Sequence, residues 1–361
     1  MSKIYSIFTG SGSYVPAKQI KNEFFHDYEF YDSTGERLLT PNEEITRKFE
    51  EITTIAERRY ASDDETTSDL ALVAAERAIE AAGIEKEELD YIIFAHNFGE
   101  TTVDNMRISV LPTLAARLKH KLGIANPSAV AYDILYGCPG WVQAVIQADY
   151  YIRSGDAKKI LVVGADVLSR ISDPHDRDSM IYADGAGAAI MEARESDPPV
   201  GVIGHNSRSD ALNYVNMLYL GYSYKPELAK KKDYYLKMNG RRLYQYALEN
   251  VPKTIKAGLD KLKLHIDQVS KVLIHQANGK MDDAILKRLY HLYGQREVPE
   301  SIMPMTISRL GNSSVATVPT LLDIILRGEM KGHNALHSGD NIVLASVGAG
   351  MNINSIVYRI P

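Results

Sequence analysis

The sequence predicts an α/β protein whose sheets are covered by helices on both faces. Short apolar runs typical of buried strands, at residues 91–95 and 160–164, alternate with amphipathic stretches typical of helices, at residues 68–82 and 140–152. This alternation is characteristic of sheets packed between layers of helices. Further strand-like runs continue the series at residues 186–191, 272–274 and 342–345.

An internal repeat is the second observation that indicates this fold class. In the first half, a helical stretch over residues 74–82 is followed by a charged bridge and by the apolar run that leads into His96. In the second half, a helical stretch over residues 251–262 leads through a similar bridge to a run followed by His275. Each half then gives a helix, a loop of small residues, another helix and an apolar strand. We therefore expect two related halves, residues 1–195 and 196–361.

The composition excludes several classes of protein. The chain has 361 residues, of which 45% are hydrophobic and 24% charged, so it can bury a large core and is not disordered. Its formal net charge is −5, so it lacks the basic field that nucleic-acid binding requires. The sequence shows no signal-peptide pattern and no stretch apolar enough to span a bilayer, so we expect a cytoplasmic protein.

Neither a metal nor a nucleotide cofactor is expected. The ten histidines show no spacing typical of metal ligands, and a single cysteine cannot form an internal disulfide or a cysteine-rich metal site. The run at residues 185–189 lacks the third glycine of a dinucleotide fingerprint and is predicted to be a strand. The polar stretch at residues 223–237, with three consecutive lysines, is interpreted as a solvated loop; the alternative is a phosphate-facing edge of a ligand entrance.

The single cysteine, Cys138, is predicted to lie at the start of a helix. It precedes Pro139, which suits the first helical turn because its missing N–H costs nothing there, and an amphipathic run over residues 141–152 follows. A thiolate at this place would face unpaired N–H groups and the positive end of the helix dipole, which lowers the pKa of a thiol. Cys138 is therefore either a reactive thiol or a small buried hydrophobic residue.

Other positions favour a site near this cysteine, although each also has an ordinary structural interpretation. His275 stands where an apolar strand stops; it could stabilise a developing charge or be a hydrogen-bonded core histidine. Asn312, in a loop of small residues, could equally cap the following helix. Gly348 and Gly350 flank Ala349, where they allow either close approach of a ligand carbonyl to the backbone or a tight turn.

Six segments in combination resemble the β-ketoacyl-acyl-carrier-protein synthase III family of the thiolase superfamily, over nearly the whole chain. They are residues 137–140 (GCPG), 162–170 (VVGADVLSR), 184–188 (DGAGA), 238–241 (MNGR), 275–278 (HQAN) and 311–314 (GNSS). The resemblance implies a thiolase-like five-layered αβαβα fold made of two duplicated halves. It also implies a homodimer that acts on acyl and malonyl-type thioesters carried by acyl carrier protein or coenzyme A.

The resemblance also implies a role for each candidate residue. Cys138 would be the nucleophile that takes an acyl group from a thioester. His275 and Asn312 would bind the thioester carbonyl of a malonyl-type extender as it loses carbon dioxide. The backbone N–H groups of Cys138 and Ala349 would form a second oxyanion hole. The further substrate-binding candidates are Arg177, Leu111, Gly240, Lys280, Gly348 and Gly350.

Departures from the family pattern are informative. The family's adenine-stacking Trp falls on Lys48, while its partner arginine is retained as Arg177, so half of the usual coenzyme A clamp is missing and a carrier-protein donor is favoured. Lys280 matches a family position that binds the acidic carrier protein; the alternative is a solvated surface charge. The segments 25–41 and 97–110 are longer than the family norm. The second leads into Leu111, which is smaller than the usual Phe, so we expect a wider or longer acyl pocket.

Taken together, the residues predict a decarboxylative condensing enzyme of fatty-acid or specialised lipid and polyketide synthesis. Three alternatives stay open at this point: a ketosynthase joining two β-ketoacyl chains into cyclohexanedione or dialkylresorcinol lipids, an acyltransferase on the same fold, and a non-catalytic partner subunit. The presence of both His275 and Asn312 argues against the acyltransferase, because decarboxylation needs their paired donors. The presence of Cys138 argues against the non-catalytic subunit, because such subunits usually lose the nucleophile.

Overall fold

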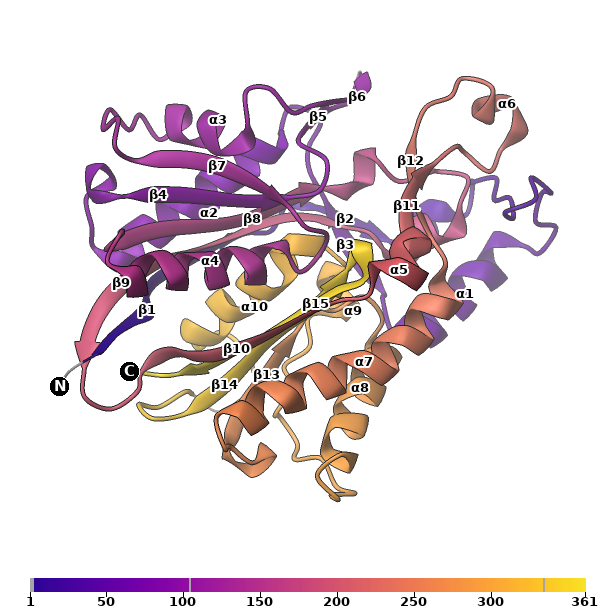
Figure 1. The fold of residues 1–361 in the computed structure, drawn as a ribbon. Helices are drawn as coiled ribbons and strands as arrows, with labels where there is room; N and C mark the ends of the chain where they lie inside the picture. The colour runs from indigo at the N-terminus through magenta and orange to yellow at the C-terminus, as the bar shows by residue number, and fades with distance from the viewer. Residues whose placement is uncertain (1–2, 104, 334) are drawn as a thin grey trace.

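The computed structural model describes residues 3–103, 105–333 and 335–361, and two mixed sheets lie at its centre (Figure 1). One sheet has five strands in the order β1-β9-β8-β4-β7 and the other has four in the order β10-β15-β14-β13. The strands of the first are β1 (Lys3–Tyr14), β4 (Tyr91–His96), β7 (Val130–Leu135), β8 (Lys159–Val167) and β9 (Asp184–Ser196). Those of the second are β10 (Gly201–Ser209), β13 (Val269–Ile274), β14 (Asn341–Gly348) and β15 (Asn352–Arg359).

The two sheets repeat the same topology. In the first, β1 pairs antiparallel with β9, β9 antiparallel with β8, and β8 parallel with β4. In the second, β10 pairs antiparallel with β15, β15 antiparallel with β14, and β14 parallel with β13. A fifth strand, β7, pairs with β4 only in the first sheet. At the corresponding edge of the second, the backbone N–H of Val272 donates to Ile302 of an irregular segment at 2.9 Å.

Helices make the other three layers. Between the sheets lie α4 (Gly140–Ser154) and α10 (Thr317–Leu326), which contact strands of both. The outer face of the first sheet is covered by α2 (Thr67–Ala82) and α3 (Leu114–Lys121), and that of the second by α7 (Gly240–Lys261) and α8 (Gly279–His291). The predicted fold class, five αβαβα layers in two related halves, is confirmed (Figure 1).

The central layer joins the halves through one hydrophobic core. Trp141 of α4 and Leu321 of α10 are completely buried, and they pack with Val162 of the first sheet and Leu344 of the second. Burial of such side chains stabilises each by about 1.5–3 kcal/mol relative to exposure. Because Cys138 lies immediately before α4 and Asn312 shortly before α10, this shared core fixes both segments relative to the two sheets.

Smaller elements surround this frame. The short strands are β2 (Lys18–Lys21), β3 (Glu57–Tyr60), β5 (Glu100–Thr102), β6 (Asn105–Ser109), β11 (Leu218–Gly221) and β12 (Tyr235–Met238). The further helices are α1 (Asn42–Thr53), α5 (Ala211–Tyr214), α6 (Pro226–Ala229) and α9 (Ile307–Leu310). Single 3₁₀ turns occur at η1 (Asn22–Phe25), η2 (Lys86–Glu88), η3 (Leu168–Arg170), η4 (Arg177–Ile181), η5 (Val215–Met217), η6 (Ile266–Gln268), η7 (Ser314–Ala316) and η8 (Ala349–Met351). Among the described residues, no helix is long and apolar enough to cross a membrane.

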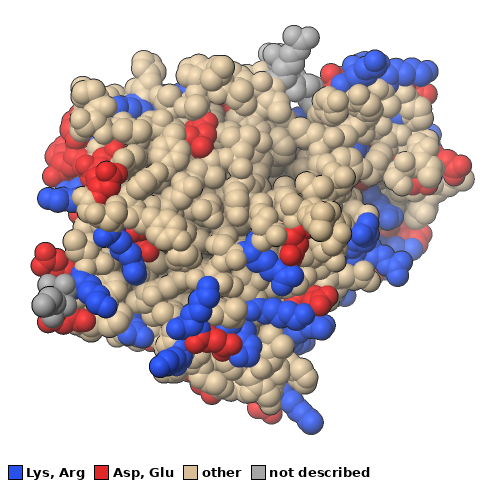
Figure 2. All heavy atoms as spheres, viewed as in Figure 1, with Lys and Arg blue, Asp and Glu red and all other residues tan. Residues whose placement is uncertain are grey.

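The interpretation of residues 223–237 as a solvated loop is wrong for one of its lysines. The segment between β11 and β12 projects as an arm that carries α6 and a cluster of basic side chains (Figures 1 and 2). Lys237, however, is completely buried, with its ammonium 2.5 Å from Asp173 and 3.1 Å from Asp176. It also lies 3.3 Å from the ring centre of Tyr224. The local run of charges predicts a solvated lysine. The prediction fails because the acidic partners of Lys237 lie more than 60 residues away in the sequence, where a local pattern gives no sign of them.

Candidate functional site

Cys138 lies in the short connection between β7 and α4. Pro139 takes the N-cap position and α4 begins at Gly140, so the cysteine stands just before the helix start. The end of β14 passes directly beside it: a Cβ added to Gly348 would lie 2.5 Å from the backbone nitrogen of Cys138. Only glycine permits this approach, which brings the C-terminal half against the cysteine.

Two backbone N–H groups next to Cys138 are available to a ligand. A Cβ on Gly137, whose φ is 68°, would come within 2.6 Å of the backbone nitrogen of Ala349, so the two loops touch here. Within the described part of the chain, neither the N–H of Cys138 nor that of Ala349 donates a hydrogen bond to a backbone or side-chain acceptor. Unpaired donors at a buried site stabilise a developing oxyanion.

Replacing Gly348 with alanine is expected to damage both stability and acyl loading, because the new methyl group would collide with the Cys138 backbone. Overpacking of this kind costs about 1–3 kcal/mol. Urea unfolding and intact-mass spectrometry after incubation with an acyl thioester measure the two effects. Gly258→Ala in α7 is the matched control, since its nearest neighbour is the movable Ser355 hydroxyl at 3.3 Å. Normal stability and loading of Gly348→Ala would contradict this close packing.

His275 follows β13 and presents a neutral ring. Its backbone N–H donates to Ala345 at 2.8 Å, which continues the β13–β14 pairing by one residue. The side chain is buried, and this burial lowers the pKa of His275 to about 4. The imidazole is therefore uncharged near neutral pH. As a neutral group it can donate through one nitrogen only.

Asn312 is held by hydrogen bonds of its backbone and by one hydrogen bond to the oxygen of its side-chain amide. Its N–H donates to Ile181 at 3.0 Å and its carbonyl accepts from Ala183 at 2.8 Å. The side-chain Oδ1 accepts from the N–H of Ser314 at 2.8 Å. Since no acceptor for Nδ2 occurs among the described residues, the amide group is oriented with its N–H donors free.

These residues line one apolar cavity, which we call the inner pocket. Cys138, His275, Asn312 and Ala349 all line it, together with the polar residues Asn97, Tyr182 and Ser314. The rest of its wall is mostly apolar and includes Phe98, Leu168, Leu218, Leu236, Leu243 and Val347. The structure thus brings the candidates from both halves to a single place.

A second cavity, which we call the vestibule, leads to the inner pocket from outside. Its volume is about 590 Å³, and it shares five lining residues with the inner pocket: Met238, Leu243, Ala277, Met281 and Asn312. Arg177, Gly240 and Lys48 all line the vestibule. Lys280 is exposed at the start of α8 and lines neither cavity, and Gly350, at φ 75°, forms the tight turn after Ala349.

The thiol of Cys138 differs from its expected state. The helix position predicts a lowered pKa, whereas burial raises the pKa of Cys138 to about 11. A hydrogen bond from Ser314 opposes this rise, and the negative charge of Asp166 adds to it. The prediction of a lowered pKa is therefore wrong for the free protein, because desolvation outweighs the helix start.

Three polar residues near Cys138 were not predicted from the sequence: Asn97, Asp166 and Ser314. They form a continuous hydrogen-bonded chain that reaches the sulfur, with Asn97 Nδ2 2.6 Å from Asp166 Oδ2 and 2.8 Å from Ser314 Oγ. Asn97 and Ser314 are 217 residues apart. The only signal was position, since Asn97 and Asp166 both fall at the carboxyl ends of apolar strand runs.

Comparisons with known proteins agree on the family. Residues 132–211 match the model of 3-oxoacyl-(acyl-carrier-protein) synthase III, and residues 259–360 match that of its C-terminal part. The chain is 33% identical over 358 residues to β-ketoacyl-acyl-carrier-protein synthase III 1 of Vibrio parahaemolyticus, covering 99% of this chain and 100% of the relative. This chain belongs to the β-ketoacyl-acyl-carrier-protein synthase III family. It is therefore a condensing enzyme of the acyltransferase class, as the sequence predicts.

Solved synthase III structures share the fold. The enzyme from Thermus thermophilus has a TM-score of 0.79 at 30% identity, over 98% of this chain and 99% of that chain. The Pseudomonas aeruginosa enzyme has a TM-score of 0.79 at 25% identity, over 99% and 98%. A priming β-ketosynthase of a polyketide pathway has a TM-score of 0.80 at 25% identity, over 99% and 96%.

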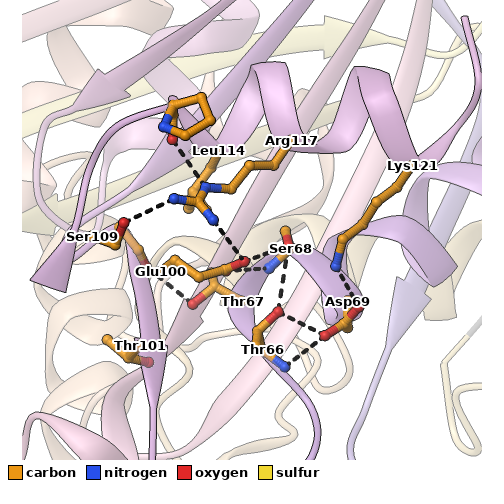
Figure 3. Close-up of polar contacts among 12 residues, drawn as sticks. Thr66, Thr67, Ser68, Asp69, Glu100, Thr101, Ser109, Leu114, Arg117 and Lys121 are labelled. Carbon is orange, nitrogen blue, oxygen red and sulfur yellow. Dashed lines mark hydrogen bonds and ion pairs between the residues drawn. The ribbon is translucent and has the colours of Figure 1, made fainter. Parts of the chain in front are cut away.

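In this synthase III, Leu111 points away from its own inner pocket. It is 79% exposed and lines neither cavity. Arg117 of α3 anchors its loop by donating to the carbonyl oxygens of Pro112 at 3.0 Å and Leu111 at 3.1 Å. Figure 3 shows Arg117 between Ser109 and Glu100, and it donates to the Ser109 hydroxyl at 2.8 Å. The guanidinium also lies 3.9 Å from the buried Glu100, which accepts two hydrogen bonds from Ser68 of α2. The loop is thus fixed on the frame with its leucine outward.

Proposed function

We propose that this protein forms a carbon–carbon bond by loading an acyl group onto Cys138 and condensing it with a malonyl-type thioester that loses carbon dioxide. The observation that carries this proposal is the convergence of three different side chains on one apolar pocket. Cys138 supplies a nucleophile, and His275 and Asn312 supply donors. Cys138 and Ala349 line the same pocket, and their N–H groups donate to no acceptor among the described residues.

In the first half-reaction, the Cys138 sulfur attacks the carbonyl carbon of an acyl thioester. A carbon–sulfur bond forms, and the carbonyl oxygen gains negative charge that the N–H groups of Cys138 and Ala349 stabilise. The intermediate then collapses, the carrier thiolate leaves, and the proton lost by Cys138 neutralises it. The acyl chain stays bound as a thioester of the enzyme, in a pocket whose apolar wall excludes water.

In the second half-reaction, a malonyl-type thioester enters through the vestibule. The neutral His275 ring and the free Nδ2 of Asn312 donate to its thioester carbonyl oxygen, which becomes the enolate oxygen as the carboxylate leaves as carbon dioxide. The enolate carbon attacks the acyl carbonyl on Cys138. A carbon–carbon bond forms, the carbon–sulfur bond breaks, and the Cys138 thiolate that leaves takes up a proton from solvent water. The apolar wall favours loss of the charged carboxylate.

The acyl donor is proposed to be acyl carrier protein rather than coenzyme A. Lys48 lines the vestibule where the family has an aromatic ring, and its ammonium lies 2.5 Å from Glu44, one turn away on α1. An ion-paired lysine offers no flat surface for an adenine to stack on. Arg177 and Arg241 also line the vestibule, and the exposed Lys280 lies on the neighbouring α8, so the surroundings suit an acidic carrier.

Two measurements together test the proposed reaction. Intact-mass spectrometry against matched acyl-carrier-protein and acyl-coenzyme A donors reports loading of Cys138, and it separates the two donors by rate. Release of carbon dioxide from a malonyl thioester, with the mass of the condensed product, reports the second half-reaction. Loading without carbon dioxide release would indicate the acyltransferase alternative. If no thioester loads Cys138, the result would indicate the non-catalytic partner subunit. A product made from a β-ketoacyl extender would indicate the enzymes that join two β-ketoacyl chains.

A homodimer formed through β7 is also part of this proposal. This strand lies at the edge of its sheet with one side unpaired, and such an edge readily pairs with another chain. Apolar side chains on this strand and in the loop that leads into α3 are exposed: Val130 by 47%, Leu135 by 62% and Leu111 by 79%. Charged groups are sparse over this face in Figure 2. A second copy would cover these groups by a two-fold, self-complementary contact.

For the wild type, light scattering is expected to give twice the mass of one chain. For the Leu135→Asp variant, we expect the mass of a single chain. The charge would be buried without a partner in such an interface. Leu39→Asp is the matched control, because Leu39 is 91% exposed and lies outside β7. A monomeric wild type, or a dimer unaffected by Leu135→Asp, would contradict an interface at β7.

A further inference from the structure

Ser314 connects two of the three residues that the proposed function requires. Its backbone N–H donates to Asn312 Oδ1 at 2.8 Å, and its hydroxyl donates to Cys138 Sγ at 3.4 Å. Ser314 is buried and has a φ of 54°, in the left-handed region that a non-glycine residue seldom adopts. Such a conformation persists only where the surroundings impose it, and it is concentrated at functional sites.

In the hydrogen-bonded series Asp166–Asn97–Ser314–Cys138, the chemistry of each group decides which one donates. Asp166 is buried, and its carboxylate accepts from the Asn97 backbone N–H at 2.8 Å and from Asn97 Nδ2 at 2.6 Å. The Nδ2 group has two protons, and the second is donated to Ser314 Oγ at 2.8 Å. Ser314 Oγ therefore acts as an acceptor on that side. A hydroxyl has a single proton, and that of Ser314 is donated to the sulfur at 3.4 Å. The Asp166 carboxylate is the competing acceptor, since a hydrogen bond from Ser314 also acts to lower the pKa of Asp166.

We propose that Ser314 is a positioning residue that stabilises the Cys138 thiolate through its hydroxyl proton, and that Asn97 and Asp166 orient this hydroxyl. The inference rests on Cys138 being the nucleophile of the proposed function. A buried thiolate needs a donor to replace the water it has lost, and Ser314 is the side-chain donor to Sγ among the described residues. Hydrogen bonds to a charged group are about twice as strong as those between neutral groups.

The same residue links the two half-reactions. The backbone of Ser314 holds the Asn312 amide with its Nδ2 group free, while the Ser314 side chain serves the sulfur. Replacing the side chain therefore affects the thiolate and leaves the backbone contact with Asn312 in place. This separation makes the hydroxyl testable on its own.

Alkylation of Cys138 by iodoacetamide measures thiolate formation directly, because Cys138 is the only cysteine of the chain. For Ser314→Ala we expect the alkylation rate at pH 8 to fall about tenfold, which corresponds to a thiol pKa higher by about one unit. Ser314→Thr keeps a hydroxyl and is expected to recover most of the rate. Ser313→Ala is the matched control, since the Ser313 hydroxyl faces Thr317 at 3.4 Å instead of the sulfur.

The outcomes separate this inference from the proposed function. A folded Ser314→Ala protein that is alkylated within twofold of the wild type would overturn the role of Ser314. If Ser314→Ala does not fold, Asn97→Ala is measured in its place, with a smaller fall of about threefold expected and an unchanged rate contradicting the inference. If the wild type reacts with iodoacetamide but accepts no acyl thioester, the proposed function fails while the alkylation result still decides the role of Ser314.

Discussion

The Cys138→Ser protein is expected to gain no acyl mass from any thioester, whereas the wild type gains one acyl group. A serine hydroxyl is a far weaker nucleophile than a thiolate unless a neighbouring base removes its proton. The structure places only the Ser314 hydroxyl within hydrogen-bond distance of Sγ among the described residues, and His275 is a buried neutral ring rather than an ion-pair partner. The described residues place no base beside a serine at this position, so loading should fall below detection in intact-mass spectra.

This substitution keeps the size of the side chain, and its thermal unfolding should match that of the wild type. The Ser313→Ala protein is a suitable loading control, because its hydroxyl lies in the same loop but does not contact the sulfur. Acyl mass that persists on Cys138→Ser would show that another group carries the acyl chain, and the nucleophile assignment would then be wrong.

The second large effect is expected for His275→Ala and Asn312→Ala, which should still load acyl chains but fail to release carbon dioxide from a malonyl thioester. Loss of one donor to a developing oxyanion costs about 3–4 kcal/mol of barrier, or roughly 10²–10³-fold in rate. Both side chains line the inner pocket without contacting Sγ, so loading should change much less than decarboxylation. Radiometric carbon dioxide release, measured beside intact-mass loading, separates the two steps.

The pH dependence of decarboxylation gives an independent check on His275. Burial lowers its pKa to about 4, so the ring stays neutral from neutral pH down to about that value and gains a proton only below it. We therefore expect no loss of decarboxylation from His275 titration between pH 6 and 8. His205→Ala is the matched control, because His205 is partly buried but lines neither cavity. Normal carbon dioxide release by His275→Ala would refute its role as a donor.

The fold was predictable because its evidence is local. The apolar runs at residues 91–95, 160–164 and 342–345 lie within β4, β8 and β14, and the repeated order of helices and strands is a property of neighbouring residues. The short strands were not predicted, because three to five residues carry too little periodicity. Lys237 was misinterpreted for a related reason, since a local charge run gives no sign of distant carboxylates.

The reactive groups of the site could be predicted from the sequence, but the polar residues that hold them in position could not. Cys138, His275 and Asn312 were found from strand and helix ends together with a family resemblance. Asn97 and Ser314 were not, because their pairing depends on how two halves of the chain meet. The raised pKa of Cys138 has the same origin: burial is a property of the assembled pocket, whereas the helix start is visible in the sequence.

The unequal edges of the two sheets limit how copies of this protein can associate. In the N-terminal half, β7 leaves one side unpaired, while in the C-terminal half the irregular segment around Ile302 occupies the corresponding edge and accepts from Val272. If two copies pair through β7 as proposed, each β7 edge is covered by the other about a two-fold axis, and the contact closes on itself. At β13, the equivalent edge is occupied by the segment around Ile302, so the C-terminal half does not offer a matching second contact there. A closed pair, rather than a row of copies joined through these two edges, is then the expected end point of assembly.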